Sequence, residues 1–375
     1  MKCKRILFAF GIVLPLIHYW FTHRSEPPKP KKTPTNWEFA FKQPYTSARP
    51  FAGGLAAVSL DGKYGYIDTR GNTVVTPSYD SADDFSEGLA QVSFQGKCFY
   101  IDDEGKTAAE YEGKVAGSTS GCGSRFSEGK AVVFTGGDQK VFIDKTGRQL
   151  FSRQFGFATS FSEGVAAVDM SASQQRNLGL IDENGKVLVQ IDYEVIDEFS
   201  DGLARVVIKH KNIAGGLDTN KGAASYGFID HTGRLVFEAP YDAVCTKFVE
   251  GLCPVSVNHR WGYINTEGVM VIDPLFEEAL NFSDGVALVR SNGKYGYILI
   301  NGRYLVPPQF QYAKDFSHGL AAVCYNNKFG YIDVSGRFVI EPQFDSADSF
   351  SDGLALVSLG GRASYIRMLK RRYWH

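Results

Sequence analysis

The chain has 375 residues, of which 44% are hydrophobic and 14% aromatic, so a sizeable core can be buried. Residues 1–32 and 362–375 hold 12 of the 40 Lys and Arg residues but one of the 41 acids. The middle of the chain therefore carries 28 basic and 40 acidic residues. An acidic body argues against nucleic acid as a partner, because phosphate neutralisation needs clustered Lys and Arg.

The first predicted element is the apolar run Ile6 to Phe21, which follows three basic residues. A cleaved signal peptide has this layout, but the sequence THRSEPP after the run offers no small-x-small cleavage site. A membrane helix of this length spans about 24 Å, short of a hydrocarbon core of about 30 Å, unless Tyr19 and Trp20 extend it at the interface. We expect residues 1–25 to form a hydrophobic helix that anchors the chain in a membrane. A cleaved signal and a buried helix remain as alternatives.

The next segment, residues 26–36, is rich in Pro and Lys. Its centre reads PPKPKKTP, from Pro27 to Pro34, which cannot pack a core and predicts a semi-rigid, extended linker. Basic residues lie on both sides of the apolar run, so the positive-inside rule gives only a weak orientation. We expect the linker to hold the rest of the chain away from the membrane.

From residue 37 to residue 366 the chain repeats one unit. The octet FSEGLAQV at Phe85 recurs in variant form at spacings of 34 to 49 residues. The phenylalanines that open these octets are Phe51, Phe85, Phe126, Phe161, Phe199, Phe248, Phe282, Phe316 and Phe350. A period of this size indicates a solenoid, a propeller or another repeat array.

One unit, from Phe51 to Asp84, shows the internal plan. Three strands are predicted in succession, at Leu55–Leu60, at Tyr64–Asp68 and around Val75, which makes the unit a β-meander. Asp61-Gly62 is a tight hairpin signal, and Asp68 with a glycine three residues later suits a type I turn. The stretch 79–84 is either a fourth, short strand or a connector. The body is therefore all-β, with repeats of about 34 residues.

The combined pattern F-x-E/D-G-L-A-x-V, G-K-W/Y-G-Y-I-D, x-x-G and P-x-Y/F-D/E resembles the WG repeat family, and Trp261-Gly262 supplies the name-giving pair. The resemblance covers residues 37–366 and implies an all-β array, common in bacteria and often preceded by a secretion or membrane segment. We expect its Phe and Trp residues to fill shared cores and its glycines to form bends. These structural positions are Phe85, Gly88, Phe161, Gly164, Phe199, Gly202, Trp261, Gly262, Phe282, Gly285, Phe316, Gly319, Phe350 and Gly353.

The two ends of the repeat region complement each other. Residues 37–50 look like the third strand and connector of a unit without its start, and residues 350–366 look like the first two strands of a unit without its end. Pairing them would close a propeller-like ring and remove the sheet edges. An open β-solenoid or spiral is the alternative, because nine blades exceed the usual four to eight and 34 residues is short for a propeller repeat. Division into two subdomains is a third possibility.

The sequence contains none of the common nucleotide-binding, hydrolase, zinc or calcium motifs. We therefore expect no catalytic residue, no cofactor and no bound metal. A row of acids follows the anchor phenylalanines and is interpreted as solvated turn caps: Glu87, Glu128, Glu163, Asp201, Glu250, Asp284 and Asp352. The pairing of Cys98, Cys122, Cys245, Cys253 and Cys324 stays open, with Cys253 interpreted as a small core residue. A hydrolase or lyase with acids near a central channel is the weaker alternative.

The longest departure from the period lies between the first two strands of the 199 unit. In a repeat stack, equivalent loops emerge on one face, often the binding face. We expect the binding residues in this loop to be Lys209, His210, Lys211, Asn212, Asp218, Asn220 and Lys221. With the family resemblance, the sequence predicts a non-enzymatic binding or scaffold protein of the bacterial cell envelope. It would cross the inner membrane once, hold its repeats in the periplasm and bind a protein or a cell-wall glycan, with residues 367–375 as a basic tail. Secretion after signal cleavage is the alternative.

Overall fold

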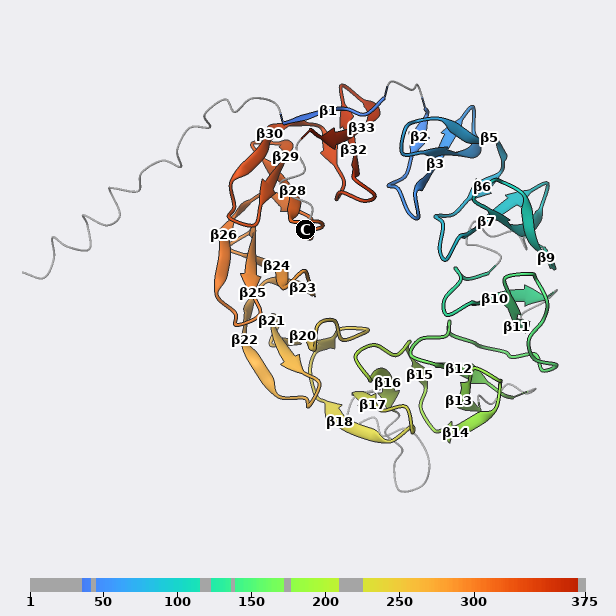
Figure 1. Ribbon diagram of the computed structural model, residues 1–375. Coiled ribbons are helices and arrows are strands. Elements are labelled where there is room, and N and C mark those ends of the chain that lie inside the picture. The colour runs from blue at the N-terminus through green and yellow to red at the C-terminus, as the bar shows by residue number, and fades with distance from the viewer. Residues whose placement is uncertain are drawn as a thin grey trace, which may run out of the picture. The chain divides into compact units, whose positions relative to one another are not determined.

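The structure is a computed structural model that describes residues 36–41, 45–114, 123–135, 139–171, 177–208 and 225–369. Its regular elements are strands, arranged in nine antiparallel sheets that follow one another around a ring (Figure 1). We call these sheets blades 1 to 9. The predicted all-β, propeller-like ring is confirmed, and the open spiral is wrong. The predicted N-terminal helix and nearly all of the linker lie outside the described residues. Within those residues, no helix has the length and apolarity needed to cross a membrane.

A complete blade has a short inner strand, two long strands and an outer strand, in that order. Blade 1 contains β2 (Ser47–Ala48), β3 (Leu55–Leu60), β4 (Lys63–Asp68) and β5 (Thr73–Tyr79); blade 2 contains β6 (Ser81–Ala82), β7 (Leu89–Phe94), β8 (Lys97–Asp102) and β9 (Thr107–Lys114); blade 3 contains β10 (Lys130–Thr135) and β11 (Gln139–Asp144); blade 4 contains β12 (Val165–Asp169), β13 (Leu178–Asp182) and β14 (Val187–Ile191). The stretch 79–84 therefore contains a short strand, β6, which belongs to the next blade as its inner strand.

The second half of the ring is more regular than the first. Blade 5 contains β15 (Val195–Ile196), β16 (Ala204–Ile208), β17 (Ser225–Ile229) and β18 (Leu235–Ala239); blade 6 contains β19 (Ala243–Val244), β20 (Leu252–Val257), β21 (Arg260–Asn265) and β22 (Met270–Phe276); blade 7 contains β23 (Glu278–Ser283), β24 (Val286–Ser291), β25 (Lys294–Leu299) and β26 (Tyr304–Phe310); blade 8 contains β27 (Tyr312–Ala313), β28 (Leu320–Tyr325), β29 (Lys328–Asp333) and β30 (Phe338–Phe344); blade 9 contains β31 (Ser346–Ala347), β32 (Leu354–Leu359), β33 (Arg362–Met368) and β1 (Trp37–Phe39).

Blade 9 is the composite blade that the sequence predicts. Its outer strand β1 comes from the start of the repeat region and pairs antiparallel with β33 from the end, with Trp37 opposite Met368. In Figure 1 the blue β1 lies beside the red β33. The hydroxyl of Tyr365 donates a hydrogen bond of 2.6 Å to the carbonyl of Arg49, and Phe51 shares a buried core with Leu354 and Tyr365. Blade 9 therefore closes the ring against blade 1.

An aromatic pair fills the core between neighbouring blades. A ring on the second long strand of one blade meets the anchor phenylalanine of the next at a centroid distance of 4.7–5.1 Å, mostly edge-on. The pairs are Tyr66–Phe85, Tyr100–Phe126, Phe142–Phe161, Phe228–Phe248, Tyr263–Phe282, Tyr297–Phe316, Tyr331–Phe350 and Tyr365–Phe51. Edge-to-face packing adds to the burial of apolar area, and the tyrosine hydroxyl needs a partner when buried. In six blades that hydroxyl donates to the carbonyl two residues before the phenylalanine.

The glycine of the Trp-Gly pair is required by the outer strand. A Cβ atom on Gly262 would lie 2.4 Å from the carbonyl oxygen of Ile272, because the register between β21 and β22 shifts at this point. Trp261 beside it is half-buried against the core between blades 6 and 7. Phe99, Val141 and Ser364 replace the glycine in blades 2, 3 and 9. Where the glycine is lost the outer strand also differs. Phe99 pairs directly with Glu110, blade 3 has no assigned outer strand, and β1 has three residues.

The interpretation of Cys253 as a core residue is confirmed, and the structure adds a disulfide bond at this position. Cys253 is buried and forms a disulfide with Cys245, at a Cα–Cα distance of 5.7 Å that suits such a bond. The bond joins the segment after the inner strand β19 to the long strand β20. Cys98 is also disulfide-bonded, and Cys324 is a buried free thiol.

Candidate functional site

The ring has two faces, defined by the two ends of its strands. The tight hairpins between the long strands lie at one end, where Leu60 pairs with Lys63, and we call this end the hairpin face. The anchor turns and the Asp-x-x-Gly turns lie at the other end, where Leu55 pairs with Asp68, and we call it the turn face. Trp37 and Met368 are paired at the turn-face end of blade 9. The first and last described residues of the ring therefore lie at the turn face.

The repeated acids of the turn face join neighbouring blades. The Glu128 carboxylate accepts a hydrogen bond of 3.1 Å from the backbone N–H of Gly164, the anchor glycine of the next blade. The six junctions with this bond are Glu87–Gly129, Glu128–Gly164, Glu163–Gly202, Asp201–Gly251, Glu250–Gly285 and Asp352–Gly54. The interpretation of these acids as solvated caps of their own turns missed this bond.

The serine before each anchor acid forms a second set of bonds on the turn face. Ser127 donates its hydroxyl hydrogen to the carbonyl of Phe161, the anchor phenylalanine of the next blade, at 2.8 Å. The serines in this role are Ser86, Ser127, Ser162, Ser200, Ser283, Ser317 and Ser351. The two remaining positions hold Ala52 and Val249, which have no hydroxyl. The anchor octet is thus a connector between blades as well as a bend.

Two carboxylates of the turn face, those of Glu87 and Asp144, lie in surroundings that favour their ionised form. Burial disfavours the charged form of Glu87, but the N–H of Gly129 and the ammonium group of Lys145 together hold its pKa below the ordinary value. In the Asp-x-x-Gly turn of blade 3, the hydroxyl and backbone N–H of Thr146 and the backbone N–H of Arg148 lower the pKa of Asp144 despite partial desolvation. These acids are charged at neutral pH and bound to the protein.

The hairpin face has a second belt of charges. Asp80 follows the outer strand of blade 1 and accepts bonds from Lys63, at 2.5 Å, and from the backbone N–H of Gln95 in the hairpin of blade 2. Asp345 makes the equivalent bonds to Lys328 and to the N–H of Gly361. The lysine and the acid of the repeat pattern therefore also join blade to blade.

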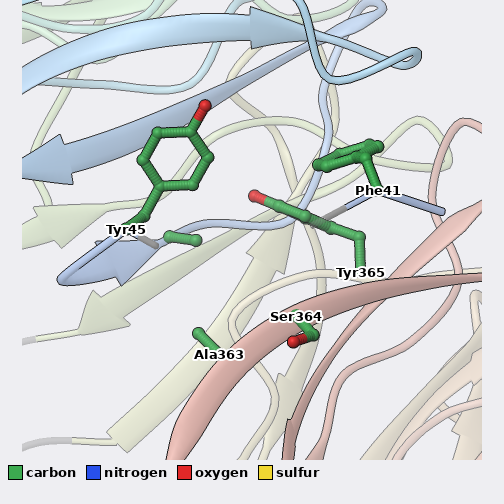
Figure 2. Close-up of a pocket in the computed structure, with 6 residues that line it drawn as sticks. Phe41, Tyr45, Ala363, Ser364 and Tyr365 are labelled. Carbon is green, nitrogen blue, oxygen red and sulfur yellow. The ribbon is translucent and has the colours of Figure 1, made fainter. Parts of the chain in front are cut away.

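One small cavity lies among the described residues of the ring. This cavity, between blades 9 and 1, is lined by Phe41, Tyr45, Ala48, Ala363, Ser364 and Tyr365 (Figure 2). It has room for about one water molecule, whereas ligand pockets measure about 300–1,000 Å³. The small side chain of Ala363 stands where blade 1 has Tyr64, which explains the gap. Among the described residues, no three His, Cys, Asp or Glu side chains lie close enough to hold a metal ion.

An apolar arc distinguishes part of the hairpin face. The first long strand of three successive blades ends on an exposed apolar residue, namely Leu359 in blade 9, Leu60 in blade 1 and Phe94 in blade 2, which are 42%, 42% and 39% exposed. Phe134 in blade 3 is exposed one residue before the end of its strand, with Lys140 lying 5.4 Å from its ring centroid. We call these four residues the hairpin-face arc. The ring does not need them, because they contribute to no blade core.

Sequence reasoning predicted binding residues in a segment other than the arc. Its candidate residues, 209–221, lie outside the described residues. The residues flanking that segment, Ile208 and Ser225, pair at the hairpin end of blade 5. The apolar residue directly before each hairpin was a signal for the arc that could have been read from the sequence.

Comparison with known families identifies the repeats and their bounds in the sequence. The sequence model of the WG containing repeat matches at residues 45–64, 64–98, 142–170, 179–211, 226–259, 261–295, 295–329 and 329–362. The chain belongs to the WG repeat family. The interval between the second and third matches, residues 99–141, contains the blade 2 and blade 3 segments that lack the glycine. Nine blades therefore correspond to eight recognisable WG repeats.

The WG ring is similar to solved structures at low sequence identity. One is a eukaryotic initiation factor, with a TM-score of 0.59, 10% identity, and coverage of 88% of this chain and 92% of that chain. Another is BamB from Moraxella catarrhalis, with a TM-score of 0.40, 10% identity, and coverage of 86% and 96%. PorZ of Porphyromonas gingivalis has a TM-score of 0.33 and 9% identity, over 87% of this chain and 52% of that one. The first likeness supports the fold alone. No curated relative matches the sequence.

Proposed function

We propose that this WG repeat protein is a non-enzymatic scaffold, tethered to the inner membrane of a bacterial envelope, that binds a partner protein through its hairpin face. The hairpin-face arc carries this proposal. The repeated charges and the glycines have roles in the ring, but the exposed Leu60, Phe94 and Leu359 have none. These residues occupy the same position in three successive blades, and exposed apolar surface gathered on one face of a folded protein marks interaction sites.

The composition of the arc favours a protein over a cell-wall glycan. Its exposed side chains are Leu and Phe, which suit an apolar protein surface, and Arg362 and Lys97 begin the strands beside them. A glycan site would offer exposed aromatic platforms between polar groups. The arc has two exposed phenylalanines, Phe94 and Phe134, beside two leucines, and Trp261 packs against a core. We expect a partner that combines apolar and acidic side chains.

The disulfide bonds support an extracytoplasmic position. Disulfides persist in oxidising compartments and are rare in the cytosol. The bonded state of Cys245, Cys253 and Cys98 agrees with export, as does the apolar run Ile6 to Phe21. Retention as a membrane anchor and secretion after cleavage differ in one observable. An anchored chain stays in the membrane fraction after a carbonate wash and is released when residues 1–32 are deleted, whereas a cleaved chain is soluble and shortened at its N-terminus.

A hydrolase or lyase is the weaker reading. It would use acids near the ring centre, and six of the anchor acids accept bonds from glycine N–H groups of the next blade. An acid engaged in this way has less freedom to transfer protons or to attack a substrate. The non-enzymatic reading therefore needs fewer assumptions.

The arc is tested by affinity capture from envelope extracts, with the full chain as bait. The variant L60D/F94D places two carboxylates in the arc and should lower capture of the partner at least tenfold. The matched control is L275D, because Leu275 is 67% exposed on the outer strand β22, away from the arc. The proposal fails if L60D/F94D folds and captures the same proteins as the wild type.

The loop predicted from the sequence is tested separately. Replacing residues 209–224 with the Asp-Gly turn of blade 1 should leave the melting temperature unchanged, because loop-closure entropy depends weakly on length. Loss of the partner in this variant alone would move the site from the arc to the loop. Loss in both variants would show one surface that includes blades 1, 2 and 5.

A further inference from the structure

Three successive blades carry the same set of residues at the hairpin face. In blades 9, 1 and 2 the inner strand is Ser-Ala, its serine pairs with a serine of the first long strand, and the next residue of that strand is exposed and apolar. A Lys or Arg then begins the second long strand. The sets are Ser346, Ser358, Leu359 and Arg362 in blade 9; Ser47, Ser59, Leu60 and Lys63 in blade 1; and Ser81, Ser93, Phe94 and Lys97 in blade 2.

The blade fold does not require this set, because other blades form the same strand pair with different residues. The two positions of the serine pair hold Val195 and Val207 in blade 5, Ala243 and Ser256 in blade 6, Glu278 and Arg290 in blade 7, and Tyr312 and Cys324 in blade 8. The repetition in blades 9, 1 and 2 is therefore a property of the surface, and it coincides with three of the four residues of the hairpin-face arc.

The alternation of side chains along a strand brings parts of neighbouring sets together. Val58 packs in the core that blade 1 shares with blade 9, so Leu60, two residues on, lies on the same side of its blade. Leu356 packs against that core from blade 9, so Ser358 faces the same junction. Phe94 and the serine pair of blade 1 have the same relation at the next junction. Each of these two junctions therefore combines one exposed apolar side chain with a pair of hydroxyl groups.

The spacing and the path of the sets suit an extended chain. Sheets packed face to face lie about 10 Å apart, so the sets follow one another at about that distance. A polyproline II chain has three residues per turn and rises about 3.1 Å per residue, so every third side chain returns to one side after about 9 Å. Nine blades complete the circle, so each junction turns the surface by about 40°. A straight helix would leave this curved path, whereas an extended chain can follow it.

The two outer sets of the three carry the available positive charge. Arg362 and Lys97 are exposed and have no ion-pair partner among the described residues, whereas Lys63 in the middle set is bound to Asp80. Asp61 in the hairpin of blade 1 is an exposed acid. A complementary ligand therefore carries acids at its two ends and none at its centre.

We propose that the hairpin-face arc binds an extended segment of the partner protein, with an apolar side chain at every third residue and acids at both ends. This inference rests on the proposed function and adds the form and the spacing of the ligand. One apolar side chain packs against each of Leu359, Leu60 and Phe94. The serine hydroxyls are available to the backbone of the segment, and its terminal acids meet Arg362 and Lys97.

The probe is a fluorescein-labelled nonapeptide, DLPSLPSLD, which has leucines three residues apart, acids at both ends and prolines that favour the polyproline II form. Its matched control, DSLLLPPSD, has the same composition without that spacing. Fluorescence anisotropy with the purified full chain in a mild detergent measures both affinities. We expect DLPSLPSLD to bind at least tenfold more tightly than the control. Added salt should weaken its binding, because exposed charges are screened.

Two variants locate the contact. L60D/F94D should lower the affinity for DLPSLPSLD at least tenfold, and K97E/R362E should lower it at low salt but leave the uncharged peptide NLPSLPSLN unaffected. L275D on the outer strand of blade 6 should bind as the wild type does. All these positions are exposed, so the variants should keep the wild-type melting temperature. Equal binding of DLPSLPSLD and its control, or retained binding by folded L60D/F94D, overturns the inference.

The outcome is separable from that of the proposed function. If L60D/F94D loses the captured partner but DLPSLPSLD binds no better than its control, the arc binds a folded surface and only the extended form is wrong. If DLPSLPSLD binds through the arc and L60D/F94D still captures the same envelope proteins, the arc recognises extended chains but those proteins bind elsewhere, and the proposed function is wrong for them.

Discussion

Ser351 in blade 9 donates its hydroxyl hydrogen to the carbonyl of Phe51 in blade 1 at 2.6 Å, across 300 residues of sequence. The same bond joins Ser317 to Phe350 at 2.7 Å in the interior of the repeat region. The closing junction therefore has the bond that joins ordinary neighbours. Asp352, the next residue, adds a second bond of 2.8 Å to the N–H of Gly54.

Removing the hydroxyl of Ser351 tests this closure. S351A should lower the free energy of unfolding by about 0.5–1.5 kcal/mol, the usual net contribution of one hydrogen bond. S317A is the matched control and should cost the same. Urea denaturation measures both values. An effect in S317A without one in S351A would mean that the ring is open between blades 9 and 1 in solution.

The aromatic pair between blades should dominate the stability of each interface. Phe282 is 1% exposed and packs against Tyr263 at 5.0 Å. F282A removes this ring and should cost about 3–5 kcal/mol. Leu275 is exposed on β22, so L275A should change the free energy of unfolding by less than about 0.5 kcal/mol. Equal melting temperatures for F282A and the wild type would contradict the burial of the anchor.

The glycine of the Trp-Gly pair should tolerate no side chain in blades whose outer strand passes close to it. A Cβ atom on Gly330 would lie 2.4 Å from the carbonyl oxygen of Ile340, so G330A should cost about 1–3 kcal/mol through a shift of the outer strand. Blade 9 already has Ser364 at this position, and S364A should be nearly neutral. Thermal melting compares the two variants, and similar losses in both would disprove the link between the glycine and the outer strand.

The turn aspartates predict a loss of stability in acid. The pKa of Asp144 is lowered in the folded chain, so its ionised form contributes stability above its ordinary pKa of about 3.9. This contribution is lost as the pH falls through the lowered folded value. Asn265 occupies the equivalent position in blade 6, so D144N should cost little at pH 7.

Unfolding curves between about pH 7 and pH 2.5 provide the measurement. D144N removes one titrating carboxyl group, and its stability should fall less steeply below about pH 4 than that of the wild type. Asp182 caps the turn of blade 4 through the same backbone bonds. D182N is therefore measured beside D144N as a second variant that removes one turn carboxyl group. A steeper acid loss in D144N would reverse the sign that we assign to Asp144.

Much of the fold could be predicted because one local pattern recurs. The spacing of the phenylalanines gives the units, and the incomplete units around Trp37 and Tyr365 give the composite blade. The choice between ring and spiral could not be made from residues, because closure depends on small rotations added over nine interfaces. No single residue encodes such a sum.

The contacts between blades were less accessible from sequence. Glu128 looks like a solvated cap until the N–H of Gly164, 36 residues away, is seen beside it. Cys245 and Cys253 have three other cysteines in the body as possible partners, and only the neighbouring inner and long strands of blade 6 select the pair. The hairpin-face arc, in contrast, could have been recognised from the apolar residues at positions 60, 94 and 359.

The composite blade sets the order in which the molecule can be assembled. Glu38 on β1 is synthesised early, but its ion-pair partner Arg367 is 329 residues away, so the first strand waits for the last. A nascent chain that has left the ribosome up to blade 8 has two open sheet edges, and such edges pair readily with other chains. Completion is therefore a single late event, and a chain cut a few residues early loses its first strand as well as its last. The adjacency of Asn36 and Leu369 would also permit circular permutation of the ring. With Leu369 linked to Asn36 and new termini opened in the hairpin at Asn292-Gly293, the blades would be synthesised in a different order and still form the same circle.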